Sequence, residues 1–166
     1  MTNKSQVGMQ LSLTVNDEVY TPADALDQII PHLDKKLTYY DCTSNTSHNI
    51  LNYLRASGFT VLGSEGRDFL VDDLPDGVDV ILTNPPYSIK DDFIARCYEL
   101  GKPWAMLMPV NTVQGKKRGA MFMRDGLEML VINHRVKFTE KGSPSFGVAW
   151  FCNDVLPDKL MFSGAI

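Results

Sequence analysis

The chain has 166 residues, of which 44% are hydrophobic and 22% are charged, as in a folded water-soluble domain. A chain of this length is expected to form one domain, residues 1–166, with residues 1–16 as a flexible N-terminal segment. No apolar run reaches the about 18 residues that a membrane span needs, and we expect neither a secretory signal nor a membrane partner.

The three cysteines, Cys42, Cys97 and Cys152, lie far apart in the sequence. An odd and scattered set argues against a disulfide framework and against a zinc site, so no metal is predicted. We therefore expect a reducing, cytoplasmic setting.

Charge is distributed unevenly around a net value of −4, which does not by itself indicate nucleic acid. Residues 1–88 contain five Lys/Arg and twelve Asp/Glu, whereas residues 89–166 contain eleven and eight. Lys116, Lys117 and Arg118 open the most basic segment and are candidate contacts for phosphates. The alternative is a solvated helix face.

Helical and strand-like segments alternate along the chain, as judged from apolar periodicity and from Gly and Pro positions. In chain order the sequence predicts a helix (21–34), a strand (37–41), a helix (44–58), strands (59–63 and 78–83), a helix (90–101), a strand (103–110), a loop and helix (111–126) and strands (127–133, 146–152 and 159–164).

This alternation predicts an α/β fold, Rossmann-like, with a mostly parallel central sheet, an antiparallel C-terminal strand pair and helices on both faces. Such sheets bind ligands at the carboxyl ends of their strands. Polar clusters follow three consecutive predicted strands: one at Asp41, one at Ser64 and Glu65, and one at residues 84–87. We expect a ligand site where these clusters meet.

The most specific cluster is Asn84-Pro85-Pro86-Tyr87, directly after the apolar strand. Prolines restrict the backbone, so the carbonyl of Pro85 can be held in place beside the side-chain oxygen of Asn84. Two acceptors match the two hydrogens of an exocyclic amino group, and Tyr87 offers a ring for stacking. The turn is therefore suited to an amine attached to a planar π system.

The stretch "DVILTNPPY" (79–87) resembles motif IV of the amino-methyltransferases, which use S-adenosylmethionine to methylate an exocyclic amine. Over roughly residues 17–163 the chain resembles the small phage-type adenine-specific (N6) DNA methyltransferases. "EVYTPADALDQII" resembles motif X, "YYDCTSNTS" lies where motif I belongs, and "VLGSEGRDFL" resembles motifs II and III. The motif order X, I, IV along the chain resembles the gamma arrangement of this family. A phage-encoded protein would act in the host cytoplasm.

The resemblance implies roles for individual residues. Asn84 and the Pro85 carbonyl would bind the target amine, Pro86 would keep the turn in shape, and Tyr87 would stack on the base. The remaining implied residues all surround S-adenosylmethionine: Asp41, Thr43, Ser44 and Asn45 at its methionine end, Glu65 at its ribose, Asp68 and Phe69 at its adenine, and Tyr20, Thr21 and Pro22 closing the pocket.

The chain departs from the family pattern where motif I normally has glycines, since Asn45 and Ser47 stand there. Residues 64–77 are too few for the helices and strand that the family places between motifs III and IV. No separate recognition domain follows motif IV, so readout of a target would come from the loops 111–119 or 137–147, or from a recognition subunit or a second copy of the chain.

These observations predict an S-adenosylmethionine-dependent methyltransferase acting on an exocyclic amine, with adenine N6 in DNA as the expected target. One alternative within enzymes is transfer to an RNA adenine or to a protein glutamine amide. A second alternative is a binding subunit that keeps the fold without the cofactor, which the altered glycine motif would favour.

Overall fold

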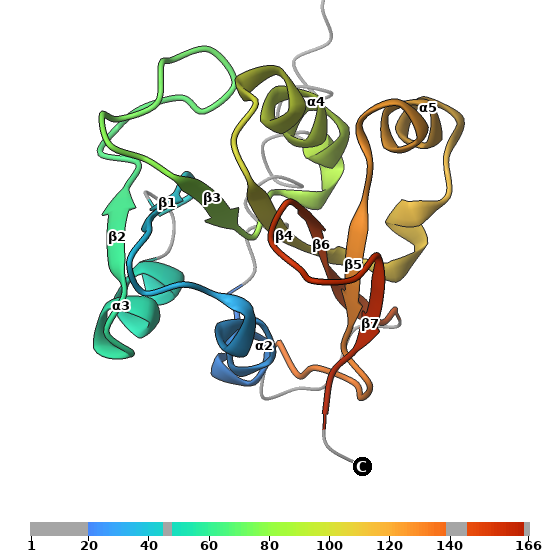
Figure 1. Cartoon of the computed structure of the whole chain (residues 1–166), viewed down its shortest axis with the longest axis horizontal. Helices are drawn as coiled ribbons and strands as arrows, with labels where there is room; N and C mark the ends of the chain where they lie inside the picture. Colours follow the sequence, from blue (N-terminus) through green and yellow to red (C-terminus); the bar gives the residue numbers. More distant parts are fainter. Residues whose placement is uncertain (1–19, 45–47, 139–145, 165–166) are drawn as a thin grey trace, which may run out of the picture.

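A single sheet of seven strands organises the computed structural model, which describes residues 20–44, 48–138 and 146–164 (Figure 1). The order across the sheet is β2-β1-β3-β4-β6-β5-β7. The strands β1 to β4 are parallel, β6 runs antiparallel to both of its neighbours, and β7 is parallel to β5. Their bounds are β1 Thr38–Asp41, β2 Thr60–Gly63, β3 Val80–Thr83, β4 Trp104–Pro109, β5 Glu128–Val131, β6 Val148–Asn153 and β7 Leu160–Phe162.

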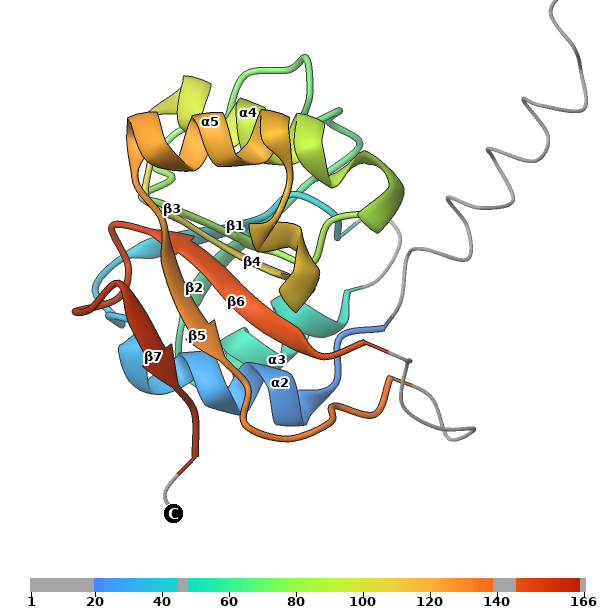
Figure 2. The same ribbon diagram turned by 90° about the vertical axis from the view of Figure 1, so that its right-hand side faces the viewer.

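Helices cover both faces of the sheet (Figure 2). One face carries α2 (Ala23–Ile29), extended by η1 (Ile30–His32), together with α3 (Asn49–Ala56). The other face carries α4 (Lys90–Leu100) and α5 (Lys116–Asp125). Two short 3-10 turns, η2 (Tyr87–Ile89) and η3 (Val110–Val113), follow the ends of β3 and β4.

The helix α4 illustrates how local sequence sets these elements. Asp91 and Asp92 lie in its first turn, where negative charge stabilises the helix dipole. Its buried side chains, Phe93, Ile94 and Cys97, recur at helical spacing. Gly101 ends the helix with φ 65°, a left-handed conformation that glycine adopts without steric cost.

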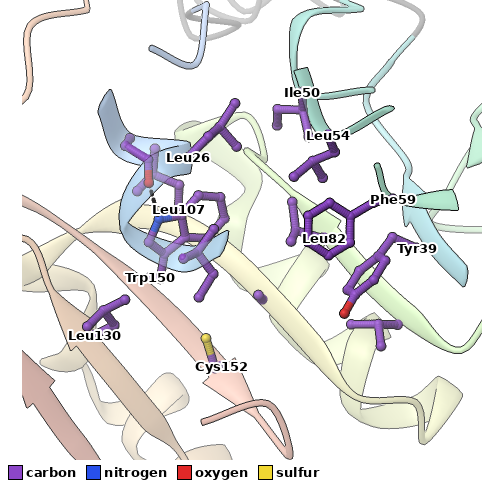
Figure 3. Packing of buried hydrophobic residues seen from close by; sticks show 14 of the residues in the cluster. Leu26, Tyr39, Ile50, Leu54, Phe59, Leu82, Leu107, Leu130, Trp150 and Cys152 are labelled. Carbon is purple, nitrogen blue, oxygen red and sulfur yellow. Dashed lines mark hydrogen bonds between the residues drawn. The ribbon is translucent and has the colours of Figure 1, made fainter. Parts of the chain in front are cut away.

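The two faces of the sheet have separate hydrophobic cores. Under α2 and α3, the Trp150 side chain is fully buried and its Nε1–H donates to the Ala25 carbonyl over 2.8 Å (Figure 3). Under α4 and α5, Trp104 is fully buried and packs edge-on against Tyr98 at 5.3 Å between ring centroids. The three cysteines are buried free thiols. Nearly every residue of the central strands is therefore enclosed.

The predicted fold class is confirmed, including the direct passage from β2 to β3 without a helix or strand in residues 64–79. One detail differs from the prediction of a C-terminal strand pair. The last two strands do not pair with each other, and β5 lies between β6 and β7. The reason is burial. Five of the six residues in β6 are buried, which suits an interior strand, whereas both ends of β7 are exposed, which suits an edge. Within the described residues, no helix is long and apolar enough to cross a bilayer.

Candidate active site

The site lies where the sheet topology reverses direction. From β1 the chain goes to β2 on one side and then returns to β3 on the other, so the carboxyl ends of β1 and β3 are neighbours. Loops leave such a point in opposite directions and open a crevice for a ligand. Asp41 ends β1 and Asn84 follows β3, so the topology places two predicted site residues together.

Asp41 is the centre of a buried hydrogen-bond network. Its Oδ1 accepts from the backbone N–H of Thr43 and from the Thr43 hydroxyl, both at 3.2 Å, and from the Thr83 hydroxyl at 3.0 Å. The two hydroxyl oxygens are 2.7 Å apart, and Thr43 also reaches the Asn84 carbonyl at 3.5 Å. The network thus ties the ends of β1 and β3 to the start of the Asn-Pro-Pro-Tyr turn.

The second oxygen of Asp41, Oδ2, is buried and has no hydrogen-bond partner among the described residues. Burial raises the pKa of this carboxyl to about 6, and the hydrogen bonds from Thr83 and Thr43 only partly offset that effect. A buried acid with an unused acceptor and a raised pKa is typical of a ligand-binding position.

The side-chain amide of Asn84 is oriented by a residue near the N-terminal end of the described chain. Its Nδ2 donates to the hydroxyl of Thr21 at 3.0 Å, and Thr21 is almost completely buried. The Thr21 carbonyl in turn accepts from Nδ2 of Asn49, the first residue of α3. Because Nδ2 faces Thr21, the acceptor Oδ1 is turned to the opposite side of the amide group. Thr21 therefore positions the residue predicted to bind the amine.

The rest of the turn is rigid and aromatic. Pro85 and Pro86 are buried, and Pro86 precedes the 3-10 turn η2, which begins at Tyr87. The Tyr87 carbonyl accepts from the Lys90 ammonium group at 3.1 Å. The Tyr87 ring packs edge-on against the Phe146 ring, with 6.1 Å between the ring centroids. The turn that starts at Asn84 therefore carries a ring that packs against an aromatic side chain from a distant part of the sequence.

A cavity of about 420 Å³ opens between the loops after β1, β2 and β3. Phe69 and Phe93 form part of its wall, with ring centroids 5.1 Å apart. The predicted residues Thr43, Asp68 and Pro86 also line it. Asp68 is exposed and uses Oδ1 to accept the N–H of Leu70, which shapes the loop after β2. The size of the cavity and its mixture of polar and apolar lining residues are those of a small-molecule site.

A second cavity of about 320 Å³ lies beside it and shares Gly66 in its wall. Ser44 and Ser64 join its two sides: their hydroxyl oxygens are 3.0 Å apart, and the Ser64 N–H donates to Ser44 Oγ at 2.7 Å. Glu65 lines this cavity with φ 49°, a left-handed conformation that costs energy for a residue with a Cβ. The strained Glu65 thus lies at the candidate site.

The basic segment is only partly available to a ligand. Arg118 donates to Asp91 at 2.8 Å and to the carbonyls of Thr112 and Gln114, so it holds the loop after β4. Lys117 lies 3.9 Å from Asp92, and Lys116 is exposed at the start of α5. The acids at the start of α4 therefore neutralise two of the three predicted phosphate contacts.

The structure brings most of the predicted site residues into one region, from Thr21 and Asp41 to the turn at 84–87. Pro22 is the N-cap residue that precedes α2, and Tyr20 is 61% exposed beside α3, while Asn45 lies outside the described residues. Sequence reasoning missed Thr83, Asn49, Phe93 and Phe146. For Thr83 the signal was its place directly before Asn84 at a strand end; the others depend on long-range contacts.

Fold and site define a Rossmann-like α/β domain with a polar crevice at the switch point of its sheet. No protein-family model matches the chain, and no curated protein matches it. Distant likenesses to solved structures exist, at 16% sequence identity or below among those compared.

Three of these likenesses illustrate the range. The 23S rRNA methyltransferase ErmE is 13% identical, with 96% of this chain and 70% of that chain covered and a TM-score of 0.49. A putative class I S-adenosylmethionine-dependent methyltransferase from Listeria monocytogenes is 14% identical, with 95% and 71% covered and a TM-score of 0.49. A modification subunit of a putative type I restriction enzyme from Vibrio vulnificus YJ016 is 14% identical, with 89% and 47% covered and a TM-score of 0.46. Likenesses this distant do not carry the substrates of those proteins over to this chain.

Proposed function

We propose that this chain is an S-adenosylmethionine-dependent methyltransferase that acts on an exocyclic amine, with adenine N6 in DNA as its favoured target. The observation that carries the proposal is the oriented amide of Asn84. Thr21 holds its Nδ2, so Oδ1 and the neighbouring Pro85 carbonyl are suited to accept the two N–H bonds of an amino group.

The residues around Asp41 fit the proposed cofactor. The buried Oδ2 of Asp41 is an acceptor suited to the ammonium group of the methionine end. Phe69 and Phe93 offer apolar walls for a flat adenine ring within the cavity of about 420 Å³, and the adjoining Glu65 carboxylate is an acceptor for ribose hydroxyls. These are the chemical features that a charged nucleoside of this size requires.

When bound, S-adenosylmethionine would supply a methyl group on a positively charged sulfur. The chain would contribute positioning and acceptors rather than a strong base. Acceptor bonds from Asn84 and Pro85 to the amine would draw its nitrogen lone pair out of conjugation. Asn84 and Pro85 would hold the nitrogen towards that methyl group. Transfer of the methyl group would leave the cofactor as a neutral thioether, and the amine would release one proton to solvent.

Tyr87 supports a planar target, because a flat base or amide can stack on an aromatic ring in the same turn as the amine acceptors, and this ring packs against Phe146. A base inside a duplex must first be turned out of its stack. Phe146 lies just before β6 and Asn111 just after β4, and these ends of the two antiparallel strands pair with each other, so both residues are proposed contacts for a target strand.

A second candidate function is transfer to a glutamine amide of a protein. It is favoured by the ion pairs of Lys117 and Arg118, which reduce the positive charge that would otherwise meet phosphates. A glutamine side chain offers the same –NH2 group on a planar π system and needs no basic surface.

Titration calorimetry with S-adenosylmethionine and S-adenosylhomocysteine tests the proposal first. We expect saturable binding, and no binding at millimolar ligand would overturn the enzymatic function and leave a cofactor-free binding subunit. Transfer of a tritiated methyl group to separate DNA, RNA and protein pools then identifies the substrate class.

Asn84→Ala tests the residue assignment. We expect methyl transfer to fall about 100-fold or more, because a preorganised acceptor is lost, while S-adenosylhomocysteine affinity changes by less than about threefold. Asn133→Ala, an exposed asparagine just after β5, is the matched control and should leave both unchanged. Equal losses of binding and transfer in Asn84→Ala would contradict the proposed role.

A further inference from the structure

The strand β7 forms one margin of the sheet, and within the described residues no further strand lies beyond it (Figures 1 and 2). Its central residue, Met161, packs against the core under α2 and α3. The flanking side chains point to the opposite face and are uncovered: Leu160 is 58% exposed and Phe162 is 63% exposed. An edge strand with two exposed apolar side chains is suited to association.

The backbone of this strand offers hydrogen bonds at the same two residues. Lys159 accepts from the Met129 N–H at 2.9 Å, and the Ser163 N–H donates to the Val131 carbonyl at 2.8 Å. The odd-numbered residues on either side of β7, Lys159 and Ser163, therefore bond towards β5. Because these directions alternate along a strand, the N–H and C=O groups of Leu160 and Phe162 point outwards from the sheet.

The opposite margin of the sheet, at β2, is closed by comparison. Arg55 donates from both Nε and Nη2 to the carbonyl of Val61, at 3.0 and 2.6 Å. Val61 itself is buried. Charged side chains that occupy an edge carbonyl hinder strand addition. Of the two margins, only β7 combines outward backbone groups with exposed apolar side chains in the described chain.

We propose that β7 pairs antiparallel with β7 of a second copy of this chain, about a two-fold axis at Met161. In this register Leu160 lies opposite the partner's Phe162, and Phe162 lies opposite the partner's Leu160. All of the outward N–H and C=O groups of these residues then bond across the interface, and the same exposed apolar side chains cover one another on one face. The strand is thus complementary to itself, as a two-fold interface requires.

The proposed pairing has a consequence for the candidate site. Strand directions reverse across the two-fold axis, so the carboxyl ends of the partner's strands point the opposite way. The two crevices at Asp41 and Asn84 would open at opposite ends of a continuous sheet. Each copy would act on its own target, and neither copy would contribute residues to the other's site.

Sedimentation velocity of the full chain over a concentration series tests the interface. We expect a reversible dimer whose dissociation constant rises about 100-fold or more in Phe162→Lys, since the burial of two phenylalanine side chains is lost. Val71→Lys is the matched control, because Val71 is a 72% exposed apolar residue in the loop after β2 and should leave the dimer intact.

Leu160→Pro tests the backbone contribution separately. Proline removes the outward N–H of residue 160 but none of the bonds to β5, so the monomer should keep its melting temperature while the dimer weakens. A chain that is monomeric up to its solubility limit would overturn the proposal. So would a dimer that survives both β7 variants, or one that the control disrupts equally.

Discussion

Asp41 and Glu128 are both buried carboxylates in the same sheet, but they are used in opposite ways. Asp41, 1% exposed, receives all of its described hydrogen bonds on Oδ1, and its Oδ2 has none within that part of the chain. Glu128, 9% exposed, uses both oxygens: Oε1 accepts from the N–H of Asp154, and Oε2 accepts from those of Val155 and Leu156.

The difference in hydrogen bonding indicates a structural role for Glu128 and a ligand-binding role for Asp41. Glu128 begins β5 and holds the turn that leads from β6 to β7, where Asp154 adopts a positive φ of 55°. Its acceptors are matched by backbone donors, so it stabilises the turn and has little capacity for a ligand. Asp41 lies at the switch point, and its Oδ2 has no hydrogen-bond partner among the described residues. Burial raises the pKa of its carboxyl to about 6. Three variants test this comparison.

The largest effect is expected for Glu128→Ala. Removing a carboxylate that binds three backbone N–H groups should lower the free energy of unfolding by about 3 kcal/mol and the melting temperature by about 6–12 °C. S-adenosylhomocysteine affinity of the folded protein should not change. Urea unfolding measures the effect, and Asp158→Ala, an exposed acid in the same turn region, is the control. A loss below about 1 kcal/mol would remove the contrast between the two acids.

Asp41→Asn should change stability in a pH-dependent way. The folded state favours the protonated acid, so this group stabilises the fold below the unfolded pKa of 3.8 and that contribution is lost as pH rises through about 6. Asparagine does not ionise, so relative to wild type the variant should gain about 2–3 kcal/mol between about pH 4 and pH 8.

Urea unfolding at both pH values measures this difference, and calorimetry should show weaker S-adenosylhomocysteine binding in Asp41→Asn. If wild type and variant change in parallel with pH, Asp41 is not the buried acid that titrates. If cofactor affinity is also unchanged, the contrast with Glu128 does not concern function.

The smallest effect on stability is expected for Thr21→Val, which keeps the shape of the side chain but removes the acceptor for Asn84 Nδ2. We expect a loss of about 1 kcal/mol in stability and about a tenfold fall in kcat with little change in KM, because Asn84 loses its orientation. Thr21→Ser retains the hydroxyl and should restore most of the rate. Equal rates for the valine and serine variants would show that Thr21 does not position Asn84.

The sequence predicted the elements well because their signals are local. Apolar spacing and Gly101 marked α4, and the run before Asn84 marked β3. It also predicted that polar residues after β1 and β3 would meet, since parallel strands align their carboxyl ends. It did not predict that β5 would separate β6 from β7, because strand order depends on which strands can be buried on both sides.

Residue types and spacing alone determined the α/β class and the placement of polar residues at the carboxyl ends of β1 and β3. Only the tertiary structure decided how these residues are used: Thr21 orients Asn84 from 63 positions away, Asp41 has one oxygen without a hydrogen-bond partner among the described residues, and Arg118 is held by Asp91. The physical reason is that hydrogen-bond capacity is shared among neighbours in space. Whether a polar side chain remains available to a ligand therefore depends on contacts between residues far apart in the sequence.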